Sequence, residues 1–210
     1  MITNKLYLYI GIILLAAAMA ISFPFPDEQP LGEARESILN MPIRTAEGFS
    51  VVGVIGVAML ITGLFFFVNS FRQYKGRVLV ISLIMVAAGP HLLANAFQQT
   101  FASGIYAIDY KKSGSNCTYE MVNATTLHGE CELSFENYSK DEVWFEVEFY
   151  ENQLVSFMNK GAPYNVSVGP GESTTIKIET DINVSNMRDY AGGSIEVGII
   201  IKSGEKTRRL

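Results

Sequence analysis

Three long apolar runs in the first hundred residues constrain the fold more than any other feature of the sequence. They cover residues 6–22, 49–71 and 78–97, and none of them contains Asp, Glu, Lys or Arg. A bilayer core about 30 Å thick is crossed by roughly 20 helical residues that rise about 1.5 Å each. The sequence therefore predicts an α + β membrane protein with three transmembrane helices in residues 1–100.

The first apolar run is also compatible with a secretory signal peptide. A single basic residue, Lys5, precedes the apolar core, and Ala18 and Ala20 provide a small-x-small cleavage pattern. An uncleaved anchor and a cleaved signal peptide therefore both stay open. Either one leads to the same topology for the rest of the chain.

The charges between the runs predict the orientation of the chain. The loop between the second and third runs carries Arg72, Lys75 and Arg77 without an acidic residue, whereas the loop at 23–48 is mainly acidic. Basic loops stay on the cytoplasmic side. We therefore expect a multi-pass protein of the cell membrane, with a cytoplasmic N-terminus if the first helix is retained and an extracytoplasmic C-terminal half.

The loop at 23–48 contains one segment with helical spacing. Its apolar residues Leu31, Ala34, Ile38 and Leu39 recur at intervals of three and four. This spacing predicts a short amphipathic helix over residues 31–40. The helix would either rest on the membrane surface or act as an ordinary connecting helix.

Three glycines of the second run predict a helix-packing face. Gly53, Gly56 and Gly63 fall on roughly one side of the helix, and small residues let helices approach closely in lipid. This face would pack within the chain's own helices or against a partner protein.

Polar residues in the third run suggest a second intramembrane feature. His91 and Asn95 are four residues apart, so they share a helical face. Polar groups inside a membrane are costly and often functional. They would form a ligand or proton site, or simply reach interfacial water or a neighbouring helix. Without an intramembrane carboxylate, they make a poor transport pathway.

The pattern changes to period two after residue 104. Val143, Phe145, Val147 and Phe149 alternate with polar or amphipathic residues, and similar alternation recurs at 174–179 and 194–202. Alternation of this kind is typical of strands with one buried face. We expect an antiparallel β-sandwich over residues 104–204, followed by a basic tail at 205–210.

The two stretches CELSFENYSKDEVWFEVEFYEN and VSVGPGESTTIKIE carry a family resemblance. Over about residues 129–180, the chain resembles the membrane-tethered immunoglobulin-like modules of prokaryotic (archaeal or bacterial) envelope proteins. The resemblance implies an immunoglobulin-like sandwich outside the membrane. It implies no activity, because such modules share a fold without sharing a function.

The two cysteines, Cys117 and Cys131, predict a disulfide. They lie in the expected exported half, where thiols oxidise, and they flank a turn that we expect at His128-Gly129. Cys117, His128 and Cys131 would make only three zinc ligands, and the cysteine spacing is too wide for a structural zinc site. We therefore expect no metal and no cofactor.

The exported half also contains an excess of glycosylation sequons. All five lie after residue 100, at Asn116, Asn123, Asn137, Asn165 and Asn183. In a host that glycosylates asparagine they predict a glycoprotein, and elsewhere they would be Asn/Ser/Thr-rich turns. Asn116 is the weakest acceptor, because its sequon contains Cys117.

The remaining patterns argue against an enzyme and against nucleic-acid binding. We find no phosphate-binding loop, nucleophile elbow or HExxH motif, and the net charge is −5.

The expected function is a non-enzymatic accessory or structural subunit of a membrane complex. Its partners would be the bilayer and other membrane proteins, and Trp144 and Tyr150 mark a candidate contact face. The alternative is a transport or ligand-handling subunit that uses His91 and Asn95.

Overall fold

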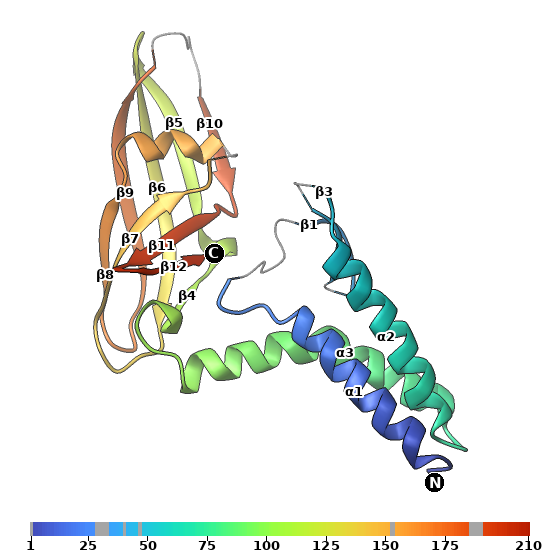
Figure 1. Ribbon diagram of the computed structural model, residues 1–210. Helices are drawn as coiled ribbons and strands as arrows, with labels where there is room; N and C mark the ends of the chain where they lie inside the picture. Colours follow the sequence, from blue (N-terminus) through green and yellow to red (C-terminus); the bar gives the residue numbers. More distant parts are fainter. Residues whose placement is uncertain (1, 28–33, 40, 46–47, 152–153, 185–190) are drawn as a thin grey trace. The chain divides into compact units, whose positions relative to one another are not determined.

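The chain forms two compact units, a helical unit at Met1–Ala96 and a β-domain at Phe97–Leu210 (Figure 1). The structure is a computed structural model that describes residues 2–27, 34–39, 41–45, 48–151, 154–184 and 191–210. The two units are described separately.

The helical unit contains helices at the three apolar runs, namely α1 (Lys5–Ile21), α2 (Val51–Asn69) and α3 (Lys75–Thr100). The side chain of Asn4 caps α1 by accepting the backbone N–H groups of Leu6 and Tyr7, and Ser50 caps α2 in the same way. With 19 and 26 residues, α2 and α3 are long and apolar enough to cross a membrane, whereas α1 has 17. The described helices thus include two of membrane-spanning length, α2 and α3, whereas α1, the first expected span, falls short of it.

Close packing between α1 and α2 depends on glycine. A methyl group added to Gly11 would lie 2.7 Å from the backbone nitrogen of Phe67, and one added to Gly63 would lie 3.1 Å from Leu14 and Leu15. The helices therefore approach each other too closely for larger side chains.

The predicted amphipathic helix at residues 31–40 is wrong for the described part of that segment. Ala34–Ile38 is a strand, β1, and it pairs antiparallel with β2 (Met41–Thr45). Residues 31–33 and 40 lie outside the described residues. A ten-residue segment is too short to form a stable helix from apolar spacing alone, and Leu39 adopts a positive φ of 47° that is incompatible with a helix.

A third short strand, β3 (Gly48–Phe49), completes this small sheet. Met41 of β2 is fully buried and joins an apolar cluster with Leu15, Ala18 and Leu60 of the helices. The sheet is therefore part of the core of the helical unit rather than a separate surface helix.

The β-domain contains nine described strands in two antiparallel sheets (Figure 1). The five-stranded sheet comprises β4 (Ile108–Tyr110), β5 (Asn116–Asn123), β6 (Thr126–Asn137), β9 (Ser173–Asn183) and β10 (Ala191–Ile195). The long β6 pairs with β9 along one side and with β5 and β4 along the other, and β10 adds to the free side of β5.

The four-stranded sheet has the order β12-β11-β7-β8. Its strands are β7 (Val143–Phe149), β8 (Tyr164–Val168), β11 (Ile199–Ser203) and β12 (Lys206–Arg209). Three short 3-10 helices accompany the strands: η1 (Gly104–Ala107) precedes β4, η2 (Lys112–Gly114) lies between β4 and β5, and η3 (Leu154–Lys160) lies between β7 and β8.

The two sheets bury one common apolar core. Phe135 of β6 lies edge-on to Phe145 of β7, with ring centroids 5.4 Å apart, and 5.3 Å from Tyr110 of β4. The predicted inward residues of β7 are all buried, from Val143 to Phe149. The period-two prediction of antiparallel strands is therefore confirmed.

The alternation at 194–202 belongs to two strands in different sheets. Glu196 has a positive φ of 55°, which breaks the extended chain between β10 and β11. As a result Ile195 is 80% exposed, whereas Val197 and Ile199 are fully buried. The sequence pattern alone concealed this change of sheet.

The predicted basic tail at 205–210 is also wrong. Its residues form strand β12, and Arg208 is only 4% exposed. The Arg208 guanidinium donates hydrogen bonds to the carbonyl oxygens of Ile105, Tyr106 and Ile108. The Ile108 carbonyl also accepts a bond of 2.7 Å from Gln98, in the last turn of α3. The segment is therefore structural, because its basic side chain satisfies buried carbonyl groups.

Candidate functional site

The cysteines form the predicted disulfide. Cys117 and Cys131 are direct partners in the β5–β6 register, and both are at most 1% exposed. The bridge therefore holds two neighbouring strands together inside the core.

The turn of this hairpin lies at residues 124–125, four residues before His128, so the predicted turn at His128-Gly129 is wrong. The reason is local. Asn123 accepts hydrogen bonds from the backbone N–H of Thr125, at 2.9 Å, and from its hydroxyl, at 3.2 Å. An Asn side chain that mimics the backbone in this way stabilises a tight turn. His128 consequently lies within β6, on the outward side of the sheet.

The outward side of the five-stranded sheet is strongly acidic. We call it the acidic face; its members are Glu120, Glu130, Glu132, Glu136, Glu179 and Asp181, with Lys111, His128 and Lys177 among them. The inward residues of the same strands are apolar, so the pleat itself separates charge from core. Sequence reasoning missed this face because β9, which supplies Glu179 and Asp181, is distant in sequence from the β5–β6 hairpin that supplies the other carboxylates.

Ion pairs shift the pKa of several of these groups. The His128 ring Nδ1 lies 2.7 Å from an Asp181 oxygen, and this hydrogen bond raises the pKa of His128 above its ordinary value. Lys177 Nζ lies 2.6 Å from Glu179 and 2.9 Å from Glu130. These contacts raise the pKa of Lys177 and, mainly through the hydrogen bond from Lys177, lower the pKa of Glu179.

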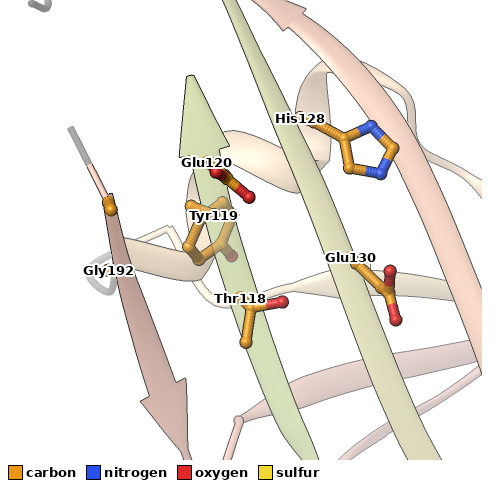
Figure 2. Close-up of a pocket in the computed structure, with 7 residues that line it drawn as sticks. Thr118, Tyr119, Glu120, His128, Glu130 and Gly192 are labelled. Carbon is orange, nitrogen blue, oxygen red and sulfur yellow. The ribbon is translucent and has the colours of Figure 1, made fainter. Parts of the chain in front are cut away.

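A shallow depression of about 260 Å³ lies beside β10. Figure 2 shows Glu120 and Thr118 on one strand, with His128 and Glu130 on the next. The lining residues are Thr118, Tyr119, Glu120, His128, Glu130, Ala191 and Gly192. At the hollow, β10 presents the small residues Ala191 and Gly192 beside Glu120 and Tyr119 of β5. Its carboxylates could hydrogen-bond a cationic group, although within the described ranges no three Asp, Glu, His or Cys side chains are arranged to hold a metal ion.

The predicted packing glycines lie inside the helical unit. A methyl group on Gly53 would lie 1.7 Å from the Pro42 carbonyl oxygen, and one on Gly56 would lie 3.0 Å from Met41 Sδ. Together with Gly63, these residues are buried on α2. Of the two readings of the glycine face, the structure therefore supports packing within the chain.

His91 and Asn95 lie on α3, and both are exposed. They do not line the depression described above, and their neighbours Leu92 and Leu93 are also exposed. The structure therefore places two polar side chains on the outer surface of an apolar helix rather than in a described cavity.

The five sequons have very different environments. Asn137 is fully buried, and its amide nitrogen donates to the carbonyl oxygens of Asp141, Val168 and Gly169. Its side-chain oxygen accepts two hydrogen bonds from Ser139. The folded domain leaves no space for a glycan there, so Asn137 acts as a structural anchor of the β6–β7 connection.

The other four acceptors are more accessible. Asn123, Asn165 and Asn183 are exposed, and Asn116 is half-buried with its amide 3.4 Å from Glu132. Sequence reasoning could not separate these residues from Asn137, because all five share one local pattern.

The predicted contact face on β7 divides into two parts. Trp144 is 63% exposed on the outer side of the four-stranded sheet. Tyr150 is half-buried, and its ring packs on Gly198. A methyl group added to Gly198 would lie 2.6 Å from a carbon of this ring. Of these two residues, only Trp144 is prominent on the surface.

The chain matches no protein-family model, no curated protein and no solved structure. Its function is therefore argued from the geometry of the two units.

Proposed function

We propose that this chain is a non-enzymatic integral membrane protein that serves as an accessory or structural subunit of a membrane complex. The helical unit would lie in the bilayer and contact other subunits. The β-domain, as an immunoglobulin-like sandwich, would lie outside the cytoplasm and bind a partner there.

The observation that carries this proposal is the apolar outer surface of the helical unit. Large apolar side chains on all three helices are more than half exposed, including Leu6, Ile13, Phe65, Ile84, Met85, Leu92 and Leu93. Burying apolar area stabilises by about 25 cal/mol per Å², so such a surface is unfavourable in water. A bilayer would cover it without any change in the fold.

His91 and Asn95 support the subunit part of the proposal. Lipid chains cannot hydrogen-bond these side chains, and a polar residue inside the membrane usually faces protein or water. A neighbouring helix from another subunit would provide the missing partners, because polar side chains hydrogen-bond across helices in membranes.

The same two residues favour the second candidate function, a transport or ligand-handling subunit. In that case His91 and Asn95 would line a pathway completed by another chain. The accessory role is preferred because the pair includes no carboxylate.

The test is purification from native membranes in mild detergent, followed by mass spectrometry of co-purifying proteins. We expect partner subunits with the wild-type chain and their loss with the His91→Leu/Asn95→Leu variant. A Leu92→Ala/Leu93→Ala variant is the matched control and should retain the partners. Recovery of the wild-type chain alone would refute the subunit role, and retained assembly with lost flux would favour transport.

A further inference from the structure

We propose that Asn165 carries an N-linked glycan whose first sugar ring packs on the indole of Trp144. This inference rests on the extracytoplasmic location in the proposed function. It adds a modification site and assigns a role to the one tryptophan of the chain.

The strand register brings the two residues together. In the β7–β8 pair, Asn165 lies opposite Glu146, and Trp144 lies opposite Ser167. Trp144 and Asn165 are therefore diagonal neighbours, which are about 7–8 Å apart and within reach of a large aromatic side chain. Both are exposed, and Phe145 between them in register points into the core. They thus share the outer face of the four-stranded sheet.

The chemistry of this face suits a sugar ring. An indole provides a large rigid apolar surface with a polar N–H at its edge, and a pyranose has an apolar face lined by C–H groups with hydroxyls around the rim. Glu146 is exposed on the same face. It follows Trp144 by two residues on β7 and lies opposite Asn165 on β8. Its carboxylate could accept hydrogen bonds from sugar hydroxyls while the ring covers the indole.

The position of Asn165 on an edge strand gives a second, independent reason. The order β12-β11-β7-β8 leaves β8 at one edge and β12 at the other. Strand β12 carries the exposed basic residues Lys206 and Arg209, whereas the described residues 164–168 of β8 contain no charged side chain. Unprotected edges invite pairing with other chains. A glycan at the second residue of β8 would block that pairing.

The other exposed sequons lie elsewhere and provide internal controls. Asn183 pairs in register with Thr126, next to Asn123, at the hairpin end of the five-stranded sheet. Because the chain has a single tryptophan, tryptophan fluorescence should respond to a glycan at Asn165 and not to one at Asn183.

The experiment uses the full chain from native membranes and two variants, Asn165→Gln and Asn183→Gln. Peptide mass spectrometry should find a glycan at Asn165 and none at the buried Asn137. Loss of the Asn165 glycan should shift tryptophan emission to longer wavelength and increase quenching by acrylamide, whereas Asn183→Gln should leave both unchanged. In protein made by a bacterial host without N-glycosylation, wild type and Asn165→Gln should have identical emission.

Three results would overturn the proposal. The first is an unmodified Asn165 in a protein glycosylated at Asn123 or Asn183. The second is a modified Asn165 whose removal leaves the fluorescence unchanged. The third is a native protein that carries no glycan. If added mannose oligosaccharides then protect Trp144 from acrylamide quenching, this face binds free sugars instead. None of these affects co-purification of partner subunits, so the proposed function is tested separately.

Discussion

The helical unit and the β-domain distribute apolar side chains in opposite ways. In the β-domain most large apolar side chains are buried, with Phe135 and Phe149 at most 1% exposed, and Trp144 is an exception on a sheet surface that otherwise carries the charges. In the helical unit Phe65 and Met85 are more than 60% exposed, and buried positions on α2 are mainly glycine. Apolar content alone therefore does not tell where apolar residues lie.

Under the proposed function, the difference would reflect two solvents. In water, burial of large apolar side chains drives folding. In lipid this drive is absent between helices, and small residues mediate close packing instead. The contrast is therefore the physical signature that supports a bilayer around the first unit and water around the second.

The largest effect is expected from a core deletion in the β-domain. Phe135→Ala should lower the free energy of unfolding by about 3–5 kcal/mol, because it removes a buried ring and leaves a cavity. The exposed Phe65→Ala is the control, with an expected change within about 0.5 kcal/mol. Thermal unfolding of the full chain in detergent, followed by circular dichroism, measures both. Equal losses of stability for the two variants would contradict the difference in apolar burial between the two units.

The disulfide should stabilise only the β-domain. Replacing both Cys117 and Cys131 by Ala should cost about 3 kcal/mol, because the bridge restricts the unfolded chain. Proteolysis with and without a reducing agent should show faster cleavage within the β-domain and unchanged protection of α1 and α2. Alkylation that finds both thiols free in the native protein would argue against the bridge and against the extracytoplasmic location.

Adding one methyl group should disrupt the helical unit where it is tightly packed. Gly53→Ala would force an atom to within 1.7 Å of the Pro42 carbonyl oxygen, and such overpacking typically costs about 1–3 kcal/mol. Gly76→Ala is the matched control, because nothing lies within 4 Å of its added carbon. The melting temperature in detergent should fall only for the first variant. A similar fall for both would mean that α2 does not pack closely against β2 at Gly53.

The smallest effect concerns pH and the acidic face. The hydrogen bond to Asp181 raises the pKa of His128, so its stabilising effect is complete below the ordinary pKa of about 6.5 and is lost as pH rises through the raised value. The two side chains are 36% and 68% exposed, which limits the effect to less than about 1 kcal/mol.

Melting curves of wild type, Asp181→Asn and the control Glu132→Gln measure this effect. Between mildly acidic and mildly basic pH, wild type and Glu132→Gln should lose stability, and Asp181→Asn should lose less. An identical pH dependence in all three proteins would exclude the pair as the cause.

Local patterns predicted the elements that local forces control. The alternation at Val143–Phe149 identified β7 and its buried side, and uncharged apolar runs located the helices. Patterns failed where pairing with a neighbouring segment or a single side-chain hydrogen bond decides the local structure. Residues 34–38 form a strand because β2 lies beside them, and His128 faces outward because Asn123 sets the turn.

The candidate site was less predictable than the fold. The cysteine pairing followed from spacing and compartment, but the acidic face required the register of β5, β6 and β9. Asn137 and Asn165 carry the same three-residue pattern, and only burial distinguishes an anchor from an acceptor. No local sequence signal reports the burial of Arg208, because its hydrogen-bond partners are about a hundred residues away.

The contact between Arg208 and Ile108 also dictates when the β-domain can be completed during biosynthesis. The two residues are 100 positions apart, so the ribosome must release strand β12 before the carbonyl groups at 105–108 find their donor. Until then β11 lacks a neighbour on one side, and the domain presents an open sheet edge. Completion of this fold therefore has to wait until residues 206–209 have emerged from the ribosome.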